Sequence, residues 1–196
     1  RNEGVSCKHN PEFTMMECYQ AYADYRDMMD LAESMLQTVA QKVRGTQTLH
    51  YQGAEIVLAG KWLRKTMRDA VLEATGVDFM AAPDLAALQQ AMRVAKIASS
   101  GEAPTWAQQV DELFSEPTFI TDYPLELSPL AKRSPTDARI VERFELFVAG
   151  MEIANAFSEL NDPIDQRGRF EAQCQAHADG DDEAHPMDEE YLRALE

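Results

Sequence analysis

The stretch Glu145–Pro163 reads ELFVAGMEIANAFSELNDP, and it decides the predicted fold. Aromatic and branched apolar residues over Phe144–Val148 favour a strand. Ala149-Gly150 follows as a two-residue turn, after which strand character resumes. The stretch therefore predicts an antiparallel hairpin, although an alanine is less comfortable than glycine where such a turn needs a positive φ.

Two glutamates of this hairpin are predicted to share one face. In the tight hairpin, Phe147 pairs with Glu152, so Glu145 and Glu152 become diagonal neighbours. Backbone positions in that relation lie roughly 7 to 8 Å apart, which allows two carboxylates to converge on one cation. The pair is a candidate metal site.

Three further polar or aromatic residues follow on the second strand with the opposite parity. On a regular strand, side chains an odd number of residues apart lie on opposite faces. Glu152 would therefore face away from Asn155, Phe157 and Glu159. A bulge or kink near Ala154 must intervene if all four face one pocket. A regular strand from Glu152 to Glu159 would contradict this hypothesis.

The first third of the chain predicts a strand followed by a long helix. Residues Glu12–Gln20 suit a strand that places Phe13, Glu17 and Tyr19 on one face. From Tyr22 to Val43 apolar residues recur every three or four positions, which predicts an amphipathic helix that ends near Gly45 and covers the back of the sheet. A short strand pair turning at Gln52-Gly53 is expected over Thr48–Leu58.

The remaining pattern divides the chain into four segments. Residues 61–116 are predicted to form a helical insertion, with Asp84 and Thr105 as helix caps. The other segments are 1–60 with the first strands and the long helix, 117–164 with further core strands beginning at Thr118–Tyr123, and the polar tail 165–196. The acidic cluster 179–183 lacks the ligand order of an EF-hand, which favours a solvated loop.

Composition limits the class of protein. The 196 residues are 45% apolar and 27% charged, which is typical of a globular domain. A net charge of −16 argues against a surface that grips a nucleic-acid backbone. The sequence has no apolar run that could span a membrane, and its three cysteines have no C-x-x-C spacing, so we expect a cytoplasmic protein with reduced thiols and no zinc site.

Five short motifs occur in order: R-N-E-G at 1–4, H-N-P-E-F-T-M-M-E at 9–17, S-P-L-A-K at 128–132, R-F-E-L-F at 143–147 and N-A-F-S-E-L-N-D-P at 155–163. Taken singly each is weak, but together they resemble the lysyl-tRNA synthetases of class II, from motif 2 to just before motif 3. The resemblance implies an α+β fold: a partial class II antiparallel sheet with flanking helices and a helical insertion.

The resemblance also implies a role for each residue that matches a family motif. The catalytic residues would be Arg1, Glu3 and His9. These three would also bind ATP, together with Asn10 and with Phe13, which would stack on adenine. Mg²⁺ would be bound by Glu145 and Glu152. Lysine would be bound by Glu17, Tyr19, Asn155, Phe157 and Glu159.

The implied activity is that of a lysine–tRNA ligase, which uses ATP and Mg²⁺ to form lysyl-adenylate and then transfers the lysyl group to tRNA(Lys). A homodimer is implied for the full-length enzyme. The carboxylates suit this substrate, because an ammonium removed from water costs several kcal/mol unless it is paired. The family's anticodon-binding OB-fold, motif 1 and motif 3 have no match in the 196 residues, so we expect these residues alone to have little or no activity.

Two departures from the family pattern and two alternatives remain. Cys7-Lys8 stands where the family commonly has Thr-Arg, and Ala149-Gly150-Met151 where it has Gly-Gly-Arg. One alternative is a paralogue that ligates a lysine-like residue to elongation factor P, which lacks the anticodon domain. Another is a noncatalytic lysine-binding or interaction module.

Overall fold

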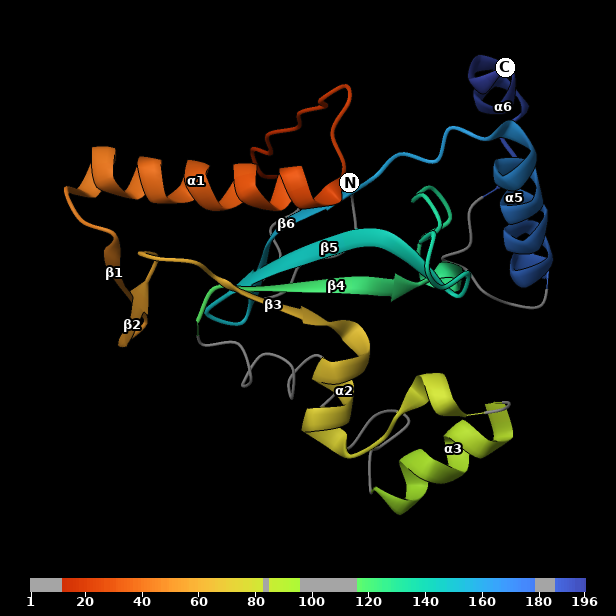
Figure 1. Cartoon of the computed structure of the whole chain (residues 1–196), viewed down its shortest axis with the longest axis horizontal. Helices are drawn as coiled ribbons and strands as arrows, with labels where there is room; N and C mark the ends of the chain where they lie inside the picture. Colours follow the sequence, from red (N-terminus) through yellow and green to blue (C-terminus); the bar gives the residue numbers. More distant parts are fainter. Residues whose placement is uncertain (1–11, 83–84, 96–115, 179–185) are drawn as a thin grey trace.

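A computed structural model describes residues 12–82, 85–95, 116–178 and 186–196. Within them the chain forms a mixed sheet with a long helix along one face and shorter helices at its ends, as Figure 1 shows. The fold is α+β, as predicted. Arg1, Glu3, His9 and Asn10, the expected caps Asp84 and Thr105, and the acidic cluster 179–183 lie outside the described residues.

The main sheet has the strand order β3-β4-β5-β6, with bounds Leu63–Thr66, Thr118–Pro124, Ile140–Val148 and Met151–Phe157. Its last three strands are antiparallel, but β3 pairs parallel to β4. Parallel neighbours need a long crossover, and the intervening residues 67–117 supply it. The sheet is therefore mixed rather than purely antiparallel, and β3 joins it from inside the segment predicted as an insertion. The division into four segments stays a prediction.

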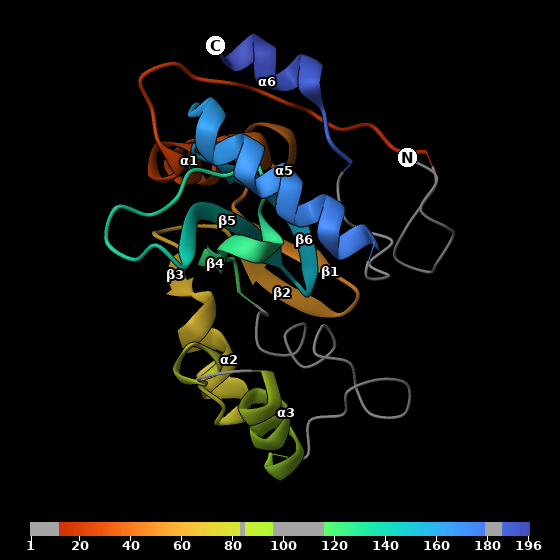
Figure 2. The same ribbon diagram turned by 90° about the vertical axis from the view of Figure 1, so that its right-hand side faces the viewer.

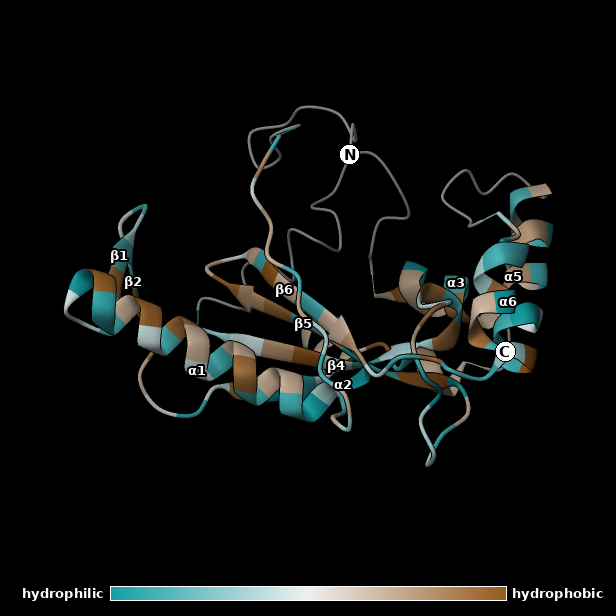
Figure 3. Cartoon of the chain, turned by 90° about the horizontal axis from the view of Figure 1, so that it is seen from above, coloured by the Kyte–Doolittle hydropathy of each residue, from teal (hydrophilic) through white to brown (hydrophobic). Residues whose placement is uncertain are grey.

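Helix α1 (Tyr25–Arg44) confirms the long amphipathic helix, beginning three residues later than the apolar pattern suggested. Asp24 caps it in a reciprocal capping box with Asp27, and Gly45 ends it at φ 74°. Its apolar face packs on one side of the sheet. Figure 3 shows that hydrophobic and hydrophilic residues alternate along this helix. The core there contains Tyr25, Met29, Ala32, Ala40, Ile56, Leu58, Trp62, Phe119, Phe144, Leu146 and Val148.

The smaller elements surround this core. Strands β1 (Thr48–Tyr51) and β2 (Ala54–Val57) form the predicted hairpin, with positive φ at Gln52 and Gly53. On the other face of the sheet, α2 (Met67–Thr75) packs against β4 through Ala70, which shares a cluster with Ile120, Tyr123 and Val141. The remaining helices are η1 (Phe79–Ala81), α3 (Leu85–Val94), η2 (Leu125–Leu127), α5 (Pro163–Ala178) and α6 (Glu189–Leu195), and Figure 2 shows α5 and α6 near the end of the sheet.

The β5–β6 hairpin has the predicted tight turn and the predicted irregularity. Ala149 and Gly150 both have positive φ, 50° and 71°, as a turn of type I′ requires. Phe147 pairs with Glu152 and Leu146 with Ala154, so Ile153 is an extra residue without a partner of its own. This β-bulge lies one residue before the expected position, and it restores a common face for the residues on either side of it.

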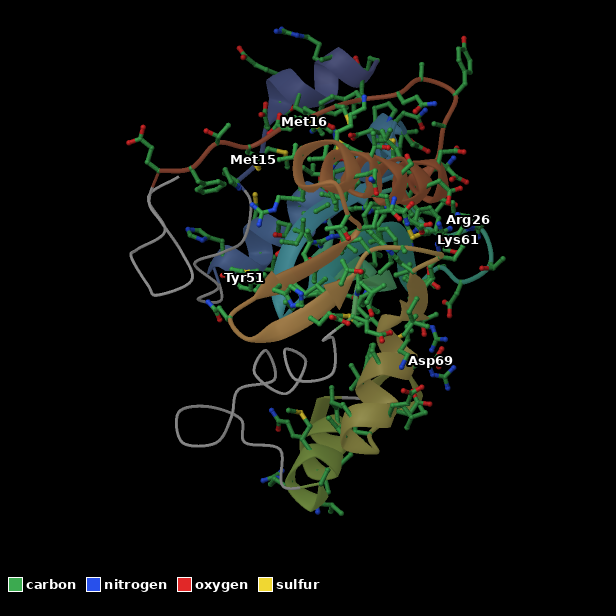
Figure 4. All side chains as sticks on the ribbon, turned by 90° about the vertical axis from the view of Figure 1, so that its left-hand side faces the viewer. Met15, Met16, Arg26, Tyr51, Lys61 and Asp69 are labelled. Carbon is green, nitrogen blue, oxygen red and sulfur yellow. The ribbon has the colours of Figure 1, made fainter. Side chains whose placement is uncertain are left out.

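The predicted strand over Glu12–Gln20 is wrong. These residues form an extended segment without ladder pairing, and Phe13 and Tyr19 are 63% and 80% exposed. Figure 4 shows Met15 and Met16 on this segment, away from the strands. Residues with strand propensity form a strand only where a neighbouring backbone supplies hydrogen bonds. Here the segment passes the sheet without pairing to it.

No helix in the described part of the chain is both long and apolar enough to cross a membrane.

The strained turn residue generates a first prediction. An L-alanine in the left-handed region costs roughly 1–2 kcal/mol, whereas asparagine tolerates that region and favours type I′ turns with glycine. We expect Ala149→Asn to raise the free energy of unfolding, measured by urea denaturation, by about 0.5–1 kcal/mol. Ala149→Val should lower it, and a gain in both variants would contradict the assignment of the turn.

Strand β4 also holds a non-glycine residue with positive φ, Asp122 at 60°, where its pairing with β5 shifts. The Tyr25 hydroxyl donates to its carboxylate at 3.4 Å. Burial raises the pKa of Asp122 despite this bond. Because the folded state disfavours the charged carboxylate, this residue lowers stability increasingly as the pH rises from its ordinary pKa through the raised one.

We therefore expect Asp122→Asn to raise the melting temperature at pH 7 and to lose that advantage near pH 3, where the wild-type carboxyl is protonated in both states. Asp137→Asn is the opposite control, because Arg139 lowers the pKa of Asp137 to about 2. That variant should melt at a lower temperature at pH 7. Equal shifts for Asp122→Asn at both pH values would refute the assignment.

Candidate functional site

The bulge at Ile153 brings predicted site residues from two strands onto one face of the sheet. Glu145 lies directly opposite Asn155, and Arg143 lies opposite Phe157. Glu152 lies opposite Phe147, which is the next residue on the same face of β5. This is the face turned away from α1, since Phe144 and Leu146 occupy the other one.

Pairing beyond the end of β6 keeps Glu159 with this group. The Ser158 N–H donates to the Glu142 carbonyl at 2.9 Å, and Glu159 forms a bridge with Ala131. Ser158 faces α1, where its hydroxyl accepts a hydrogen bond from the Tyr25 N–H at 3.1 Å. Alternation therefore places Glu159 on the face of Phe157.

One arginine connects the site residues. Arg143 donates from Nη2 to Glu145 Oε1 at 2.6 Å and from Nε to Asn155 Oδ1 at 3.1 Å. Its Nη1 donates to Ser128 Oγ at 2.8 Å and to the Leu127 carbonyl at 3.0 Å. The guanidinium thus joins β5, β6 and the loop after β4 through charge-assisted bonds.

The loop that anchors this arginine is held from behind by α5. Arg169, only 7% exposed, donates to the carbonyls of Ser128 and Ala131 and forms an ion pair with Asp165. Gln166 is fully buried and donates to the Pro129 carbonyl at 3.0 Å. The S-P-L-A-K motif therefore has a structural role in this protein: its backbone carbonyls fix the wall of the site.

The two predicted metal ligands influence each other electrostatically. Loss of solvation, and then the negative charge of Glu145, raise the pKa of Glu152 above its ordinary value, while Arg143 opposes that shift. Two carboxylates that repel each other on one face are a donor set that suits Mg²⁺, which binds through one or two carboxylates and completes its shell with water and phosphate. Among the described residues there is no cluster of three or more candidate metal ligands, so the fit depends on this pair.

The lysine-binding set that the sequence predicted is only partly assembled. Asn155, Phe157 and Glu159 share the site face, and burial raises the pKa of the Glu159 carboxyl. Glu17 and Tyr19, like the predicted adenine-stacking residue Phe13, lie on the exposed segment before α1 rather than on a strand of the sheet. The strand face that these three residues were predicted to share is absent from the structure.

Two residues near the site were not assigned from sequence. Arg143 stood inside a quoted motif, but nothing in its spacing indicated that it bonds three elements. Tyr191 on α6 packs its ring against Phe170 at 6.0 Å, and burial, followed by the negative charge of Glu159, raises its pKa. The sequence held no signal for Tyr191, because its position depends on the packing of α6 on α5.

Comparison with known proteins gives this face its chemical context. Residues 1–196 match the family described as tRNA synthetases class II (D, K and N). The chain belongs to this family. The match covers the extended segment, the long helix and the bulged hairpin together.

Curated relatives in this family share about half of the residues. The chain is 54% identical over 203 residues to the lysine–tRNA ligase of Chloroflexus aurantiacus and 52% identical over 203 residues to that of Staphylococcus haemolyticus. It is 51% identical over 206 residues to a lysine–tRNA ligase of Staphylococcus aureus. All of this chain is covered in each comparison, but it spans only 41% of each relative's length.

The electrostatic link between the two glutamates can be measured directly. We expect Glu145→Gln to lower the pKa of Glu152, observed by carboxyl carbon NMR, without returning it fully to the ordinary value, because loss of solvation is the larger cause. Glu142→Gln is the matched control, since Glu142 precedes Arg143 on the opposite face of β5. An unchanged pKa in Glu145→Gln would show that the two carboxylates do not interact.

Proposed function

We propose that this chain is the catalytic segment of a lysine–tRNA ligase, which activates L-lysine with ATP and transfers it to tRNA(Lys). The observation that supports the proposal most strongly is the shared face of Glu145, Glu152, Asn155, Phe157 and Glu159, produced by the bulge at Ile153. The identity to curated lysine–tRNA ligases supports the choice of lysine and of tRNA as the acceptor.

Activation requires the lysine carboxylate to attack the α-phosphate of ATP in line, so negative charge must be balanced on both sides of the phosphorus. In this proposal Glu145 and Glu152 would hold Mg²⁺, which would supply positive charge beside the pyrophosphate. Arg143 keeps Glu145 oriented through the 2.6 Å bond. Arg1, Glu3, His9, Asn10 and Phe13 remain proposed nucleotide-binding residues.

Recognition of lysine needs a carboxylate whose charged form becomes more stable when an ammonium binds beside it. Glu159 fits this requirement, because partial loss of solvation raises the pKa of its carboxyl even though the residue is exposed. An ammonium beside it would relieve that cost and lower its pKa. Glu17 and Tyr19 are proposed as further lysine-binding residues, which requires the segment before α1 to move against the sheet when substrate binds.

The dimer that the resemblance implies and the cytoplasmic location that the composition predicts both stay predictions. A ligase acting on elongation factor P would share the activation chemistry but would charge that protein instead of tRNA(Lys), so an acceptor assay separates the two. A noncatalytic interaction module would bind neither lysine nor ATP in calorimetry. The site geometry favours binding, since its carboxylates are arranged together on one face.

Glu159→Gln tests the lysine site. We expect it to raise the KM for lysine in pyrophosphate exchange at least 10-fold while changing the KM for ATP much less, because a buried ammonium would lose its counter-charge. The assay uses the longest natural polypeptide that contains this chain. Glu171→Gln, an exposed position on α5, is the control and should match the wild type.

Equal increases in KM for lysine and ATP in Glu159→Gln would argue against a specific contact with the lysine ammonium.

A further inference from the structure

The guanidinium of Arg143 makes several hydrogen bonds and a contact with an aromatic ring. Each of its three nitrogens donates a hydrogen bond, to acceptors on Leu127, Ser128, Glu145 and Asn155. Its plane also lies over the ring of Tyr123, with 4.7 Å between the guanidinium carbon and the ring centroid. The side chain is 15% exposed, so these contacts, rather than water, fix its orientation.

This arrangement also fixes its two functional neighbours. One oxygen of Glu145 is engaged by the guanidinium, and the Tyr123 side chain also interacts with this carboxylate. The carbonyl oxygen of Asn155 is engaged as well, so the orientation of its amide is set by the donor it faces. Neither residue can rotate without breaking a charge-assisted bond.

We propose that Arg143 is a positioning residue that couples the cation-binding carboxylate Glu145 to the lysine-pocket residue Asn155. The inference rests on the proposed function, because it takes the roles of these two residues from there. Arginine suits the task since its planar fork reaches both side chains and the loop at once, whereas a lysine ammonium is a single point of attachment. The positions of the two subsites then depend on one guanidinium.

The chain offers a matched control in Arg169. That arginine is more deeply buried and bonds the carbonyls of Ser128 and Ala131, so it supports the same loop. Its carboxylate partner is Asp165 on its own helix, rather than a residue proposed to bind cation or lysine. Substituting Arg169 therefore tests the effect of loosening the loop alone.

The experiment compares Arg143→Lys and Arg169→Lys in the longest natural polypeptide that contains this chain. We measure the dissociation constant of Mn²⁺ alone by electron paramagnetic resonance, and the KM values for Mg²⁺ and lysine in pyrophosphate exchange. For Arg143→Lys we expect Mn²⁺ to bind roughly 10- to 100-fold more weakly, the range typical when a partner of a metal ligand is lost. Both KM values should rise with it, whereas Arg169→Lys should lower the melting temperature and change all three constants much less than Arg143→Lys does.

The possible outcomes separate the two proposals. A wild-type protein without lysine-dependent exchange overturns the proposed function itself. An active wild type in which Arg143→Lys leaves the constants unchanged, or alters them no more than Arg169→Lys does, overturns the positioning role. If Arg143→Lys fails to fold, Ser128→Ala decides, because it removes one anchor of the guanidinium: weaker Mn²⁺ binding with a higher KM for lysine supports the inference, and unchanged values overturn it.

Discussion

The site depends on one constraint, the strict alternation of side chains along a strand, and on the single residue that interrupts it. Without the extra residue Ile153 in β6, Glu152 would face away from Asn155, Phe157 and Glu159. The bulge brings both sets to the face opposite α1. The tight turn at Ala149-Gly150 sets the register from which this count begins, so this turn and a bulge three residues after Gly150 determine which side chains can act together.

The hairpin and its turn were predictable from sequence because both follow from local rules of pairing. The bulge followed from parity only on the condition that Glu152 and the later site residues face one pocket. Helix α1 was predictable for the same reason, since periodicity and its caps are local. The segment Glu12–Gln20 was predicted wrongly, because a strand also needs a neighbouring backbone, and its sequence carries no information about whether one is paired with it. The roles of Arg143 and Tyr191 were missed because they arise from contacts between distant segments.

Different elements of the fold support the sheet and carry the proposed functional residues. Helix α1 buries its apolar face against one side of the sheet and forms the larger core. Helix α5 holds the loop after β4 through Arg169 and Gln166, and that loop in turn anchors Arg143. Buried groups of α1 and α5 thus support the hairpin, while the glutamates on its polar face remain accessible to solvent.

The salt bridge between Arg143 and Glu145 also sets the charge of the site. With two carboxylates and one guanidinium, the group formed by Arg143, Glu145 and Glu152 carries a single net negative charge when all are ionised. A divalent cation bound there converts the same group to a single net positive charge. This group of three residues would then repel a polyphosphate while empty and attract it once the cation is present, so its electrostatics would favour nucleotide that arrives together with its metal.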